Sequence, residues 1–218
     1  MKLTKLKPKV LVLSGYGLNC EDETAFAFET AGAKAEIVHV NDLQSLKNYQ
    51  IFVIPGGFSF GDDTGSGKAF ANKLKAKLGD EIQKFIARDT LAIGICNGFQ
   101  IMTNMGLLPG ALTHNDSKRY ISTWVEIEKI GESPWLEGIN KLEVPIAHGE
   151  GKYIKNGKIE VAFRYVQNPN GSTDDIAGVL GYDGRVLGMM PHPERAQFPW
   201  QRGGHGIQIF KNAIKYFT

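Results

Sequence analysis

Residues 90–106, TLAIGICNGFQIMTNMG, decide the fold, because a short apolar run is followed at once by a helix-like stretch. The run at 90–96 has the length and composition of a buried strand. Residues 97–106 favour a short helix that Gly106 closes. Cys96 therefore stands in a tight strand-to-helix turn, and the whole stretch predicts one unit of an α/β fold.

Strand-like and helix-like segments alternate through the first half of the chain. The strand-like segments are 9–14, 35–40, 50–57 and 90–96, and the helix-like segments are 21–32, 67–88 and 97–106. Such alternation predicts a parallel sheet that helices cover on both faces.

After residue 110 the sequence becomes rich in β-branched and aromatic residues, with Gly and Asn turns. The β-rich runs are 120–130, 141–148, 158–166, 176–182 and 185–190. Asp183-Gly184 is a hairpin signal, and a helix is expected over 204–217. We therefore expect an α/β fold with an open, mostly parallel sheet flanked by helices. β-Hairpins are added in the second half, and a single domain spans 1–218.

Composition narrows the classes of function. The chain has 218 residues, 42% of them hydrophobic, and 25 basic against 23 acidic side chains give a net charge of +2. So small a charge gives no reason to expect a nucleic-acid or membrane-surface partner. The start, MKLTKLKPK (1–9), is not typical of a signal peptide and is expected to be a frayed tail. No apolar run could span a bilayer. We expect a cytoplasmic protein with Cys20 and Cys96 reduced.

The turn around Cys96 has features of a catalytic site. Gly94 and Gly98 give a G-x-C-x-G pattern similar to a nucleophile elbow, which would place the sulfur at the carboxyl edge of the sheet. A helix N-terminus lowers the pKa of a thiol, and the amide of Asn97 would face negative charge developing beside the sulfur. The alternative is a packed structural cysteine, and spacing alone does not separate the two.

A cysteine nucleophile needs a base, and MMPHPER (189–195) offers one. Met190 and His192 both precede prolines, which favour extended backbone. In an extended chain residues i and i+2 share a face, so Glu194 is predicted to hold the imidazole of His192. A rigid loop with a surface ion pair is the alternative. Together with the elbow, the segment favours a Cys-His-Glu triad.

The segment PGGFSFGD (55–62) follows a predicted strand, and its paired glycines suit a backbone donor of an oxyanion hole. An ordinary strand-to-loop turn is the alternative. The adjacent GDDTGSGKA (61–69) looks like a phosphate loop, but its spacing is one residue too long. Ala69 also replaces the Ser or Thr that would hold magnesium. We expect no nucleotide site there, and no metal cluster with ligand spacing is visible.

With GICNGFQ, PHPE and PGGFSFGD in this order, the chain resembles the class I (triad) glutamine amidotransferases. Over IAHGEG (146–151), FRYVQNPNGSTDDIAGV (163–179) and MPHPER (190–195) it is similar to the glutaminases of phosphoribosylformylglycinamidine synthase, in purine biosynthesis. The resemblance runs from about residue 9 to the end and implies a flavodoxin-like class I glutaminase fold.

The resemblance implies roles for named residues. Cys96 would be the nucleophile, His192 the acid/base and Glu194 its orienter, while Gly57 and Asn97 would supply the oxyanion-hole amides. The residues implied to contact glutamine are Gly56, Phe58, Gln100, His148, Gly149 and Glu150. For His148 a satisfied structural histidine is an equal alternative.

The resemblance also implies a partner. Ammonia from glutamine would pass to a large synthetase subunit that uses ATP and magnesium to convert formylglycinamide ribonucleotide to the amidine, with a third small subunit as an optional component. This chain itself would need no cofactor. One departure concerns the loop after PGGFSFGD, where GDDTGSGKAFANKL (61–74) looks more like the long, fused form of the enzyme. That leaves the assembly open.

Two other functions stay open from the residues alone. One is a stand-alone cysteine hydrolase or chaperone-like protein of the related elbow superfamily, which gives PHPE no role. The other is a non-catalytic regulatory module, which predicts no thiol reactivity. Cys20 stands in the first strand-to-helix loop, SGYGLNC (14–20), with no base predicted nearby, and is expected to be structural.

Overall fold

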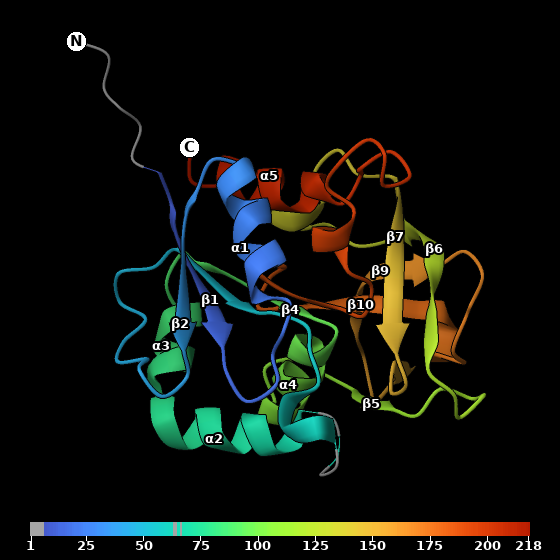
Figure 1. The fold of residues 1–218 in the computed structure, drawn as a ribbon, viewed down its shortest axis with the longest axis horizontal. Coiled ribbons are helices and arrows are strands. Elements are labelled where there is room, and N and C mark those ends of the chain that lie inside the picture. Colours follow the sequence, from blue (N-terminus) through green and yellow to red (C-terminus); the bar gives the residue numbers. More distant parts are fainter. Residues whose placement is uncertain (1–6, 63–64, 66) are drawn as a thin grey trace.

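The parallel strands form one half of a large sheet (Figure 1). The structure, a computed structural model, describes residues 7–62, 65 and 67–218, so most of the expected N-terminal tail lies outside it. The parallel strands are β1 (Lys9–Ser14), β2 (Lys34–His39), β3 (Ile51–Ile54), β4 (Leu91–Ile95) and β11 (Val186–Met189), in the order β2-β1-β3-β4-β11. The side chains of β3 and β4 are buried throughout, as expected for a central parallel strand.

The second half of the chain continues the same sheet in antiparallel fashion. Its strands are β10 (Ile176–Gly181), β9 (Glu160–Tyr165), β6 (Ile121–Lys129) and β7 (Lys141–His148), joined in that order to β11. β10 and β11 form the hairpin that Asp183-Gly184 predicts. β5 (Ala111–Thr113) and β8 (Lys152–Ile154) pair separately and were not predicted, because three-residue strands show too little periodicity.

Two groups of helices flank the parallel strands. The helices are α1 (Glu21–Thr30), α2 (Lys68–Leu78), α3 (Glu81–Ile86), α4 (Asn97–Met105) and α5 (Ile207–Lys215). α1 packs on β1, β2 and α5, whereas α4 packs on β3, β4, β11 and α2 (Figure 1). The predicted open α/β sheet with flanking helices is confirmed.

One helix prediction is wrong in detail. A single helix was expected over 67–88, but the chain breaks into α2 and α3 at Gly79, whose φ of 51° and ψ of −125° are not helical. Ile82, Phe85 and Ile86 still share a buried face on α3, so the periodicity located the packing surface correctly.

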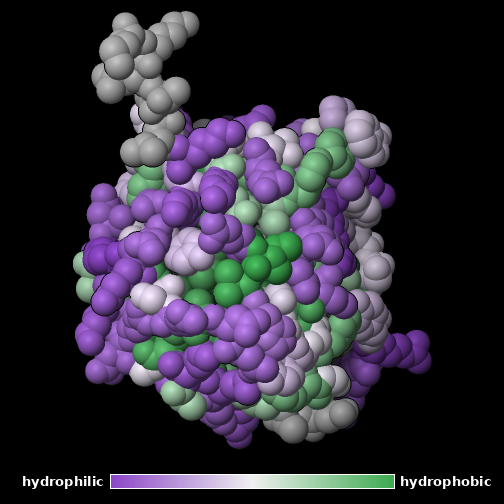
Figure 2. Space-filling model, turned by 60° about the vertical axis from the view of Figure 1, so that its left-hand side comes forward, coloured by the Kyte–Doolittle hydropathy of each residue, from purple (hydrophilic) through white to green (hydrophobic). Residues whose placement is uncertain are grey.

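The surface is mostly hydrophilic around a smaller apolar area on the face seen in Figure 2. The helices of the described part of the chain lack the length and apolar character that a transmembrane helix needs.

The sheet register brings the predicted site together. In the parallel pairs, Ile95 of β4 lies opposite Met189 of β11, and Ile54 of β3 lies opposite Gly94. The segments that follow these strands therefore leave the same carboxyl edge, where ligands bind in open α/β sheets.

Candidate active site

Cys96 occupies a sharp turn between β4 and α4. Its φ of 51° and ψ of −107° lie in a region that residues other than glycine rarely adopt. Its backbone N–H donates to the carbonyl of Met189 (2.8 Å), which ties the turn to β11. Gly98 passes so close to β3 that a Cβ there would lie 1.8 Å from the carbonyl oxygen of Ile54. The predicted tight strand-to-helix turn at Cys96 is confirmed.

His192 and Glu194 form a buried pair just after β11. Nδ1 of His192 lies 2.5 Å from Oε1 of Glu194, and both residues are 2% exposed or less. The prediction that this segment is extended is only partly correct, because Pro193–Arg195 form a 3-10 turn. Proline is well suited to the first position of such a turn, since it has no N–H to leave unsatisfied. The expected contact between residues i and i+2 forms nonetheless.

The charge state of His192 depends on this pair. Burial by itself would lower its pKa, but the Glu194 carboxylate and the thiols of Cys96 and Cys20 raise the pKa well above its ordinary value. Within the described part of the chain, Nε2 of His192 and Oε2 of Glu194 are buried without a hydrogen-bond partner. The imidazole is thus held at one nitrogen and left open at the other.

The Cys96 thiol is close enough to His192 to raise its pKa, but it is turned toward β7. It donates to the carbonyl of Ala147 at an Sγ···O distance of 3.8 Å. The N–H of His192 donates to Pro145 of the same strand (2.8 Å). The edge strand β7 therefore holds both the predicted nucleophile, Cys96, and its predicted base, His192.

Gly57 and Asn97, the predicted oxyanion-hole residues, border the same turn. Gly57 has φ 154°, and a Cβ there would lie 2.4 Å from the carbonyl oxygen of Gly17, so the position requires glycine. Neither amide donates to a backbone carbonyl within residues 7–62, 65 and 67–218. Both N–H groups are therefore free for a ligand oxygen.

The predicted glutamine contact Gln100 is already engaged at both ends of its carboxamide. Its Oε1 accepts from Nδ2 of Asn97 (2.7 Å), and its Nε2 donates to the backbone carbonyl of Glu150 (2.6 Å). Oδ1 of Asn97 accepts from the N–H of Ser59 (3.1 Å). This series of hydrogen bonds links the turn at Cys96 to the turn at 148–151 and to the segment after Gly57.

Phe58, another predicted contact, is 41% exposed and packs against Tyr120, with ring centroids 6.1 Å apart. Burial raises the pKa of Tyr120, and the charges of Cys96 and His192 reach its hydroxyl. Both rings thus lie at the rim of the site. Of the atypical loop after Asp62, residues 63, 64 and 66 lie outside the described residues.

His148, Gly149 and Glu150 are held by a buried asparagine. Nδ1 of His148 lies 3.0 Å from Oδ1 of Asn115, which also accepts from the N–H of Gly151, while Nδ2 of Asn115 donates to the carbonyl of His148 (2.9 Å). Because that oxygen can only accept, His148 carries its proton on Nδ1. Burial, reinforced by the charge of His192, lowers the pKa of His148 to about 4. His148 is therefore neutral near pH 7.

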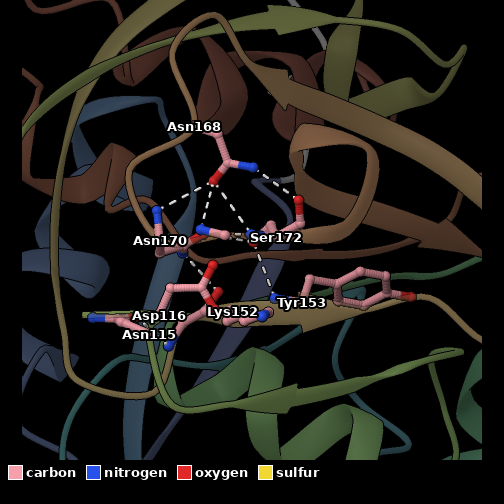
Figure 3. A network of polar contacts seen from close by, with 9 residues as sticks. Asn115, Asp116, Lys152, Tyr153, Asn168, Asn170 and Ser172 are labelled. Carbon is pink, nitrogen blue, oxygen red and sulfur yellow. Dashed lines mark hydrogen bonds and ion pairs between the residues drawn. The ribbon is translucent and has the colours of Figure 1, made fainter. Parts of the chain in front are cut away.

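A polar network joins this turn to the segment at 168–172 (Figure 3). Asn170 donates to the carbonyl of Gly151 (2.9 Å) and accepts from the hydroxyl of Ser172 (2.7 Å), and that hydroxyl accepts from the N–H of Tyr153. Oδ1 of Asn168 accepts from three successive N–H groups, those of residues 170–172. The sequence singled out this run but gave none of these residues a role. Clustered Asn and Ser before a strand is the signal that could have indicated a side-chain scaffold.

The expectation that Cys20 has no base nearby is wrong. Its sulfur accepts from Nη2 of Arg195 (3.0 Å), and the ligating atoms of Cys20, His192 and Glu194 all lie within 4.8 Å of one another. Burial raises the pKa of the Cys20 thiol, and His192 offsets only part of this rise. Linear spacing showed no metal cluster because Cys20 and His192 are far apart in the sequence and meet only through the fold.

Comparisons with known proteins identify the family of this chain. Residues 7–217 match the family of CobB/CobQ-like glutamine amidotransferase domains. The chain is 43% identical to phosphoribosylformylglycinamidine synthase subunit PurQ of Methanococcus maripaludis, over 99% of this chain and 100% of the relative. It is 40% identical to the PurQ subunit of Thermotoga maritima, over 97% and 99% of the two chains.

A solved structure, "Structure of PurLQS from Thermotoga maritima", superimposes with a TM-score of 0.90 at 38% identity, covering 98% of this chain and 100% of that chain. Family, sequence relatives and fold therefore point the same way, and the chain belongs to the glutamine amidotransferase family and, within it, to the PurQ subunits of phosphoribosylformylglycinamidine synthase.

Proposed function

We propose that this chain is the glutaminase subunit of phosphoribosylformylglycinamidine synthase. It hydrolyses glutamine to glutamate and ammonia through a cysteinyl thioester and delivers the ammonia to a synthetase subunit. The observation that carries the proposal is the juxtaposition of a strained cysteine elbow with a buried His192–Glu194 pair at one edge of the sheet.

Cys96 is the nucleophile of this reaction. Its thiol turns from the carbonyl of Ala147 toward Nε2 of His192, which has no other partner within the described chain, and gives up its proton there. The thiolate attacks the side-chain carbonyl carbon of glutamine. Glu194 keeps Nδ1 protonated and stabilises the imidazolium that forms.

Ammonia then leaves by general-acid catalysis. His192 returns its proton to the amide nitrogen as the C–N bond breaks, which leaves a glutamyl thioester on Cys96. Water attacks the thioester with His192 as the base, and the C–S bond breaks to release glutamate and the thiol. The free amides of Gly57 and Asn97 stabilise the oxyanion of both tetrahedral intermediates.

We assign the glutamine pocket to two segments. Gly56 and Phe58 flank the oxyanion-hole residue Gly57, and His148, Gly149 and Glu150 stand at the end of β7 and in the turn after it. Gln100 bridges the two through Asn97 and the carbonyl of Glu150, so we assign it the task of holding the pocket together as well as bordering it.

The partner is the large synthetase subunit, with a third small subunit as an optional component of the assembly. Residues 1–218 act as a single glutamine amidotransferase domain, and the synthetase uses ATP and magnesium to turn formylglycinamide ribonucleotide into the amidine. This chain needs no cofactor for the glutaminase half-reaction. Two reduced thiols at the site fit a cytoplasmic enzyme.

A glutamine-analogue diazoketone tests the assignment. We expect it to alkylate Cys96 and spare Cys20, and we expect glutamine to protect against labelling, as read by peptide mass spectrometry. The same preparation with glutamine should supply ammonia to the synthetase. Labelling of Cys20 alone would overturn the nucleophile, and glutamine hydrolysis that never supports the synthetase would favour a stand-alone hydrolase.

A further inference from the structure

We propose that Cys20, His192 and Glu194 form an inhibitory binding site for a thiophilic divalent cation such as zinc. The inhibitory effect rests on the proposed function, because it needs His192 as the proton carrier. The binding itself does not. Cys20 is the residue of the site that the glutaminase chemistry leaves unused.

The three donors are already gathered. Their ligating atoms lie within 4.8 Å of one another, and each residue is 2% exposed or less. In a tetrahedral zinc site with bonds of about 2.0–2.3 Å, neighbouring donors are roughly 3.3–3.8 Å apart. Side-chain adjustments of roughly 1 Å would therefore close the site around the ion.

The donor chemistry matches zinc. A thiolate, an imidazole and a carboxylate are its usual protein ligands, and hard cations such as magnesium do not favour this set. Oε2 of Glu194 and Nε2 of His192 are buried without a hydrogen-bond partner in the described residues. Because Glu194 holds Nδ1 of His192, an ion shared by the two residues would bind Nδ1 in place of its proton and would satisfy the unpartnered Oε2 of Glu194.

The neighbouring cation can move away. Arg195 donates from Nη2 to the Cys20 sulfur (3.0 Å) and from Nε to Glu23 (3.0 Å). Its side chain is 37% exposed, so it can keep the Glu23 ion pair while Nη2 swings toward solvent. Once the thiol has lost its proton, zinc takes the place of the guanidinium at the sulfur.

Binding would stop the glutaminase. A metal ion on Nδ1 leaves the proton of the neutral imidazole on Nε2, so His192 can no longer accept the proton of Cys96 or of water. Removal of the ion by a chelator should restore activity, because no covalent bond of the protein is broken. Cys20 would thus make the glutaminase sensitive to free zinc.

A direct binding test uses cadmium ion as the probe. The chain has two cysteines, so in full-length Cys96→Ala the sulfur of Cys20 alone can give sulfur-to-cadmium charge-transfer absorption in the ultraviolet. We expect one saturable equivalent of this absorption, absent from Cys96→Ala/Cys20→Ser. No charge-transfer absorption in Cys96→Ala would overturn the site, and this readout does not depend on the glutaminase assignment.

An inhibition test uses zinc ion on the enzyme. We expect reversible inhibition of the wild type, weakened about tenfold or more in Cys20→Ser and in Cys20→Ala, each relative to its own metal-free rate. Two variants guard against a folding defect in one of them, which far-UV circular dichroism would reveal. His205→Ala, which removes an exposed histidine, should be inhibited like the wild type. Equal inhibition of wild type and both Cys20 variants would overturn the proposal.

Discussion

Cys20 and Cys96 are two buried thiols at two strand-to-helix turns, and both stand at the N-cap of a helix beside the same imidazole. Their backbones differ. Cys96 has φ 51°, whereas Cys20 has an ordinary φ of −107° and ψ of 17°. Only Cys96 therefore stands on a strained turn, which aims its side chain out of the sheet edge.

The charges around the two turns differ as well. The first turn of α1 carries Glu21, Asp22 and Glu23, and burial together with the charge of Glu194 raises the pKa of the Cys20 thiol. The first turn of α4 has no acidic residue. Cys20 is in addition held by polar partners, donating to Oδ1 of Asn19 (3.4 Å) and accepting from Arg195. A thiol near a histidine is thus not sufficient for a nucleophile, since the backbone and the local charge decide.

The largest expected effect comes from removing the thiol on the strained turn. Cys96→Ala should abolish glutaminase activity, a loss on the order of 10⁵-fold or more, because no other group can form the thioester. The fold should persist, since alanine meets the same φ as cysteine. Steady-state glutamine hydrolysis and far-UV circular dichroism measure the two outcomes.

The assembled complex supplies the control. Ammonia-driven synthesis with Cys96→Ala should equal the wild type, because the synthetase chemistry lies on another chain. Near-normal hydrolysis of glutamine by Cys96→Ala would transfer the nucleophile to Cys20 and break the comparison.

The shared imidazole is the next test. His192→Ala should lower kcat by about a thousandfold or more, whereas Glu194→Gln should be roughly ten to a hundred times less severe. In Glu194→Gln the new side-chain amide oxygen can still accept a hydrogen bond from Nδ1 of His192. It carries no negative charge, so the pKa of His192 should fall. The acid limb of the pH profile should shift to lower pH in Glu194→Gln. Small and equal losses at both positions would point to a structural role for PHPE.

Local sequence predicted one of the two thiol sites and missed the other. The 94–98 turn could be predicted because its glycines, its strand and its helix are contiguous. The contact between His192 and Glu194 could be predicted from their separation of two residues. The approach of Cys20 to His192 could not, because it depends on how the loop after β1 and the loop after β11 meet at one sheet edge.

Other features were hidden for similar reasons. The break at Gly79 divides a continuous periodic pattern, and the 3-10 turn after His192 competes with the extended backbone that its prolines favour. The scaffold of Asn115 and Asn170 joins residues from separate loops through side-chain hydrogen bonds, which leave no periodicity to detect. Sequence therefore predicted most of the elements and the class of chemistry, whereas the long-range polar contacts were found only in the structure.

The two buried histidines of the site, His148 and His192, differ in the direction of their pKa shifts. This difference predicts a smaller effect, on stability. Unlike His192, His148 has a pKa lowered to about 4, against about 6.5 in an unfolded chain. Between these two pH values the unfolded state binds more protons than the folded state. The contribution of neutral His148 to the free energy of unfolding is therefore complete above about pH 6.5 and is lost as the pH falls. The loss should reach about 3 kcal/mol near pH 4.

The measurement compares denaturant unfolding of wild type and His148→Gln across this range. The side chain introduced by His148→Gln can still donate a hydrogen bond to Oδ1 of Asn115. All other titrating groups are the same in the two proteins. The free energy of unfolding of the wild type should therefore fall more steeply below pH 6.5. Parallel curves would mean that folding does not change the pKa of His148.

The smallest expected effect is that of replacing Cys20, the second of the two thiols. Cys20→Ser keeps a small side chain that can accept from Arg195 and donate to Asn19, while it removes the sulfur next to His192. Because the residue carries neither the thioester nor the proton, kcat for glutamine in metal-free buffer should drop by no more than about threefold, with KM changed as little. The pKa of His192 should fall slightly, since the Cys20 thiol is one of the groups that raise it. A loss as large as that of His192→Ala would show that the second thiol belongs to the proton path, and the difference in backbone between the two turns would then no longer explain their roles.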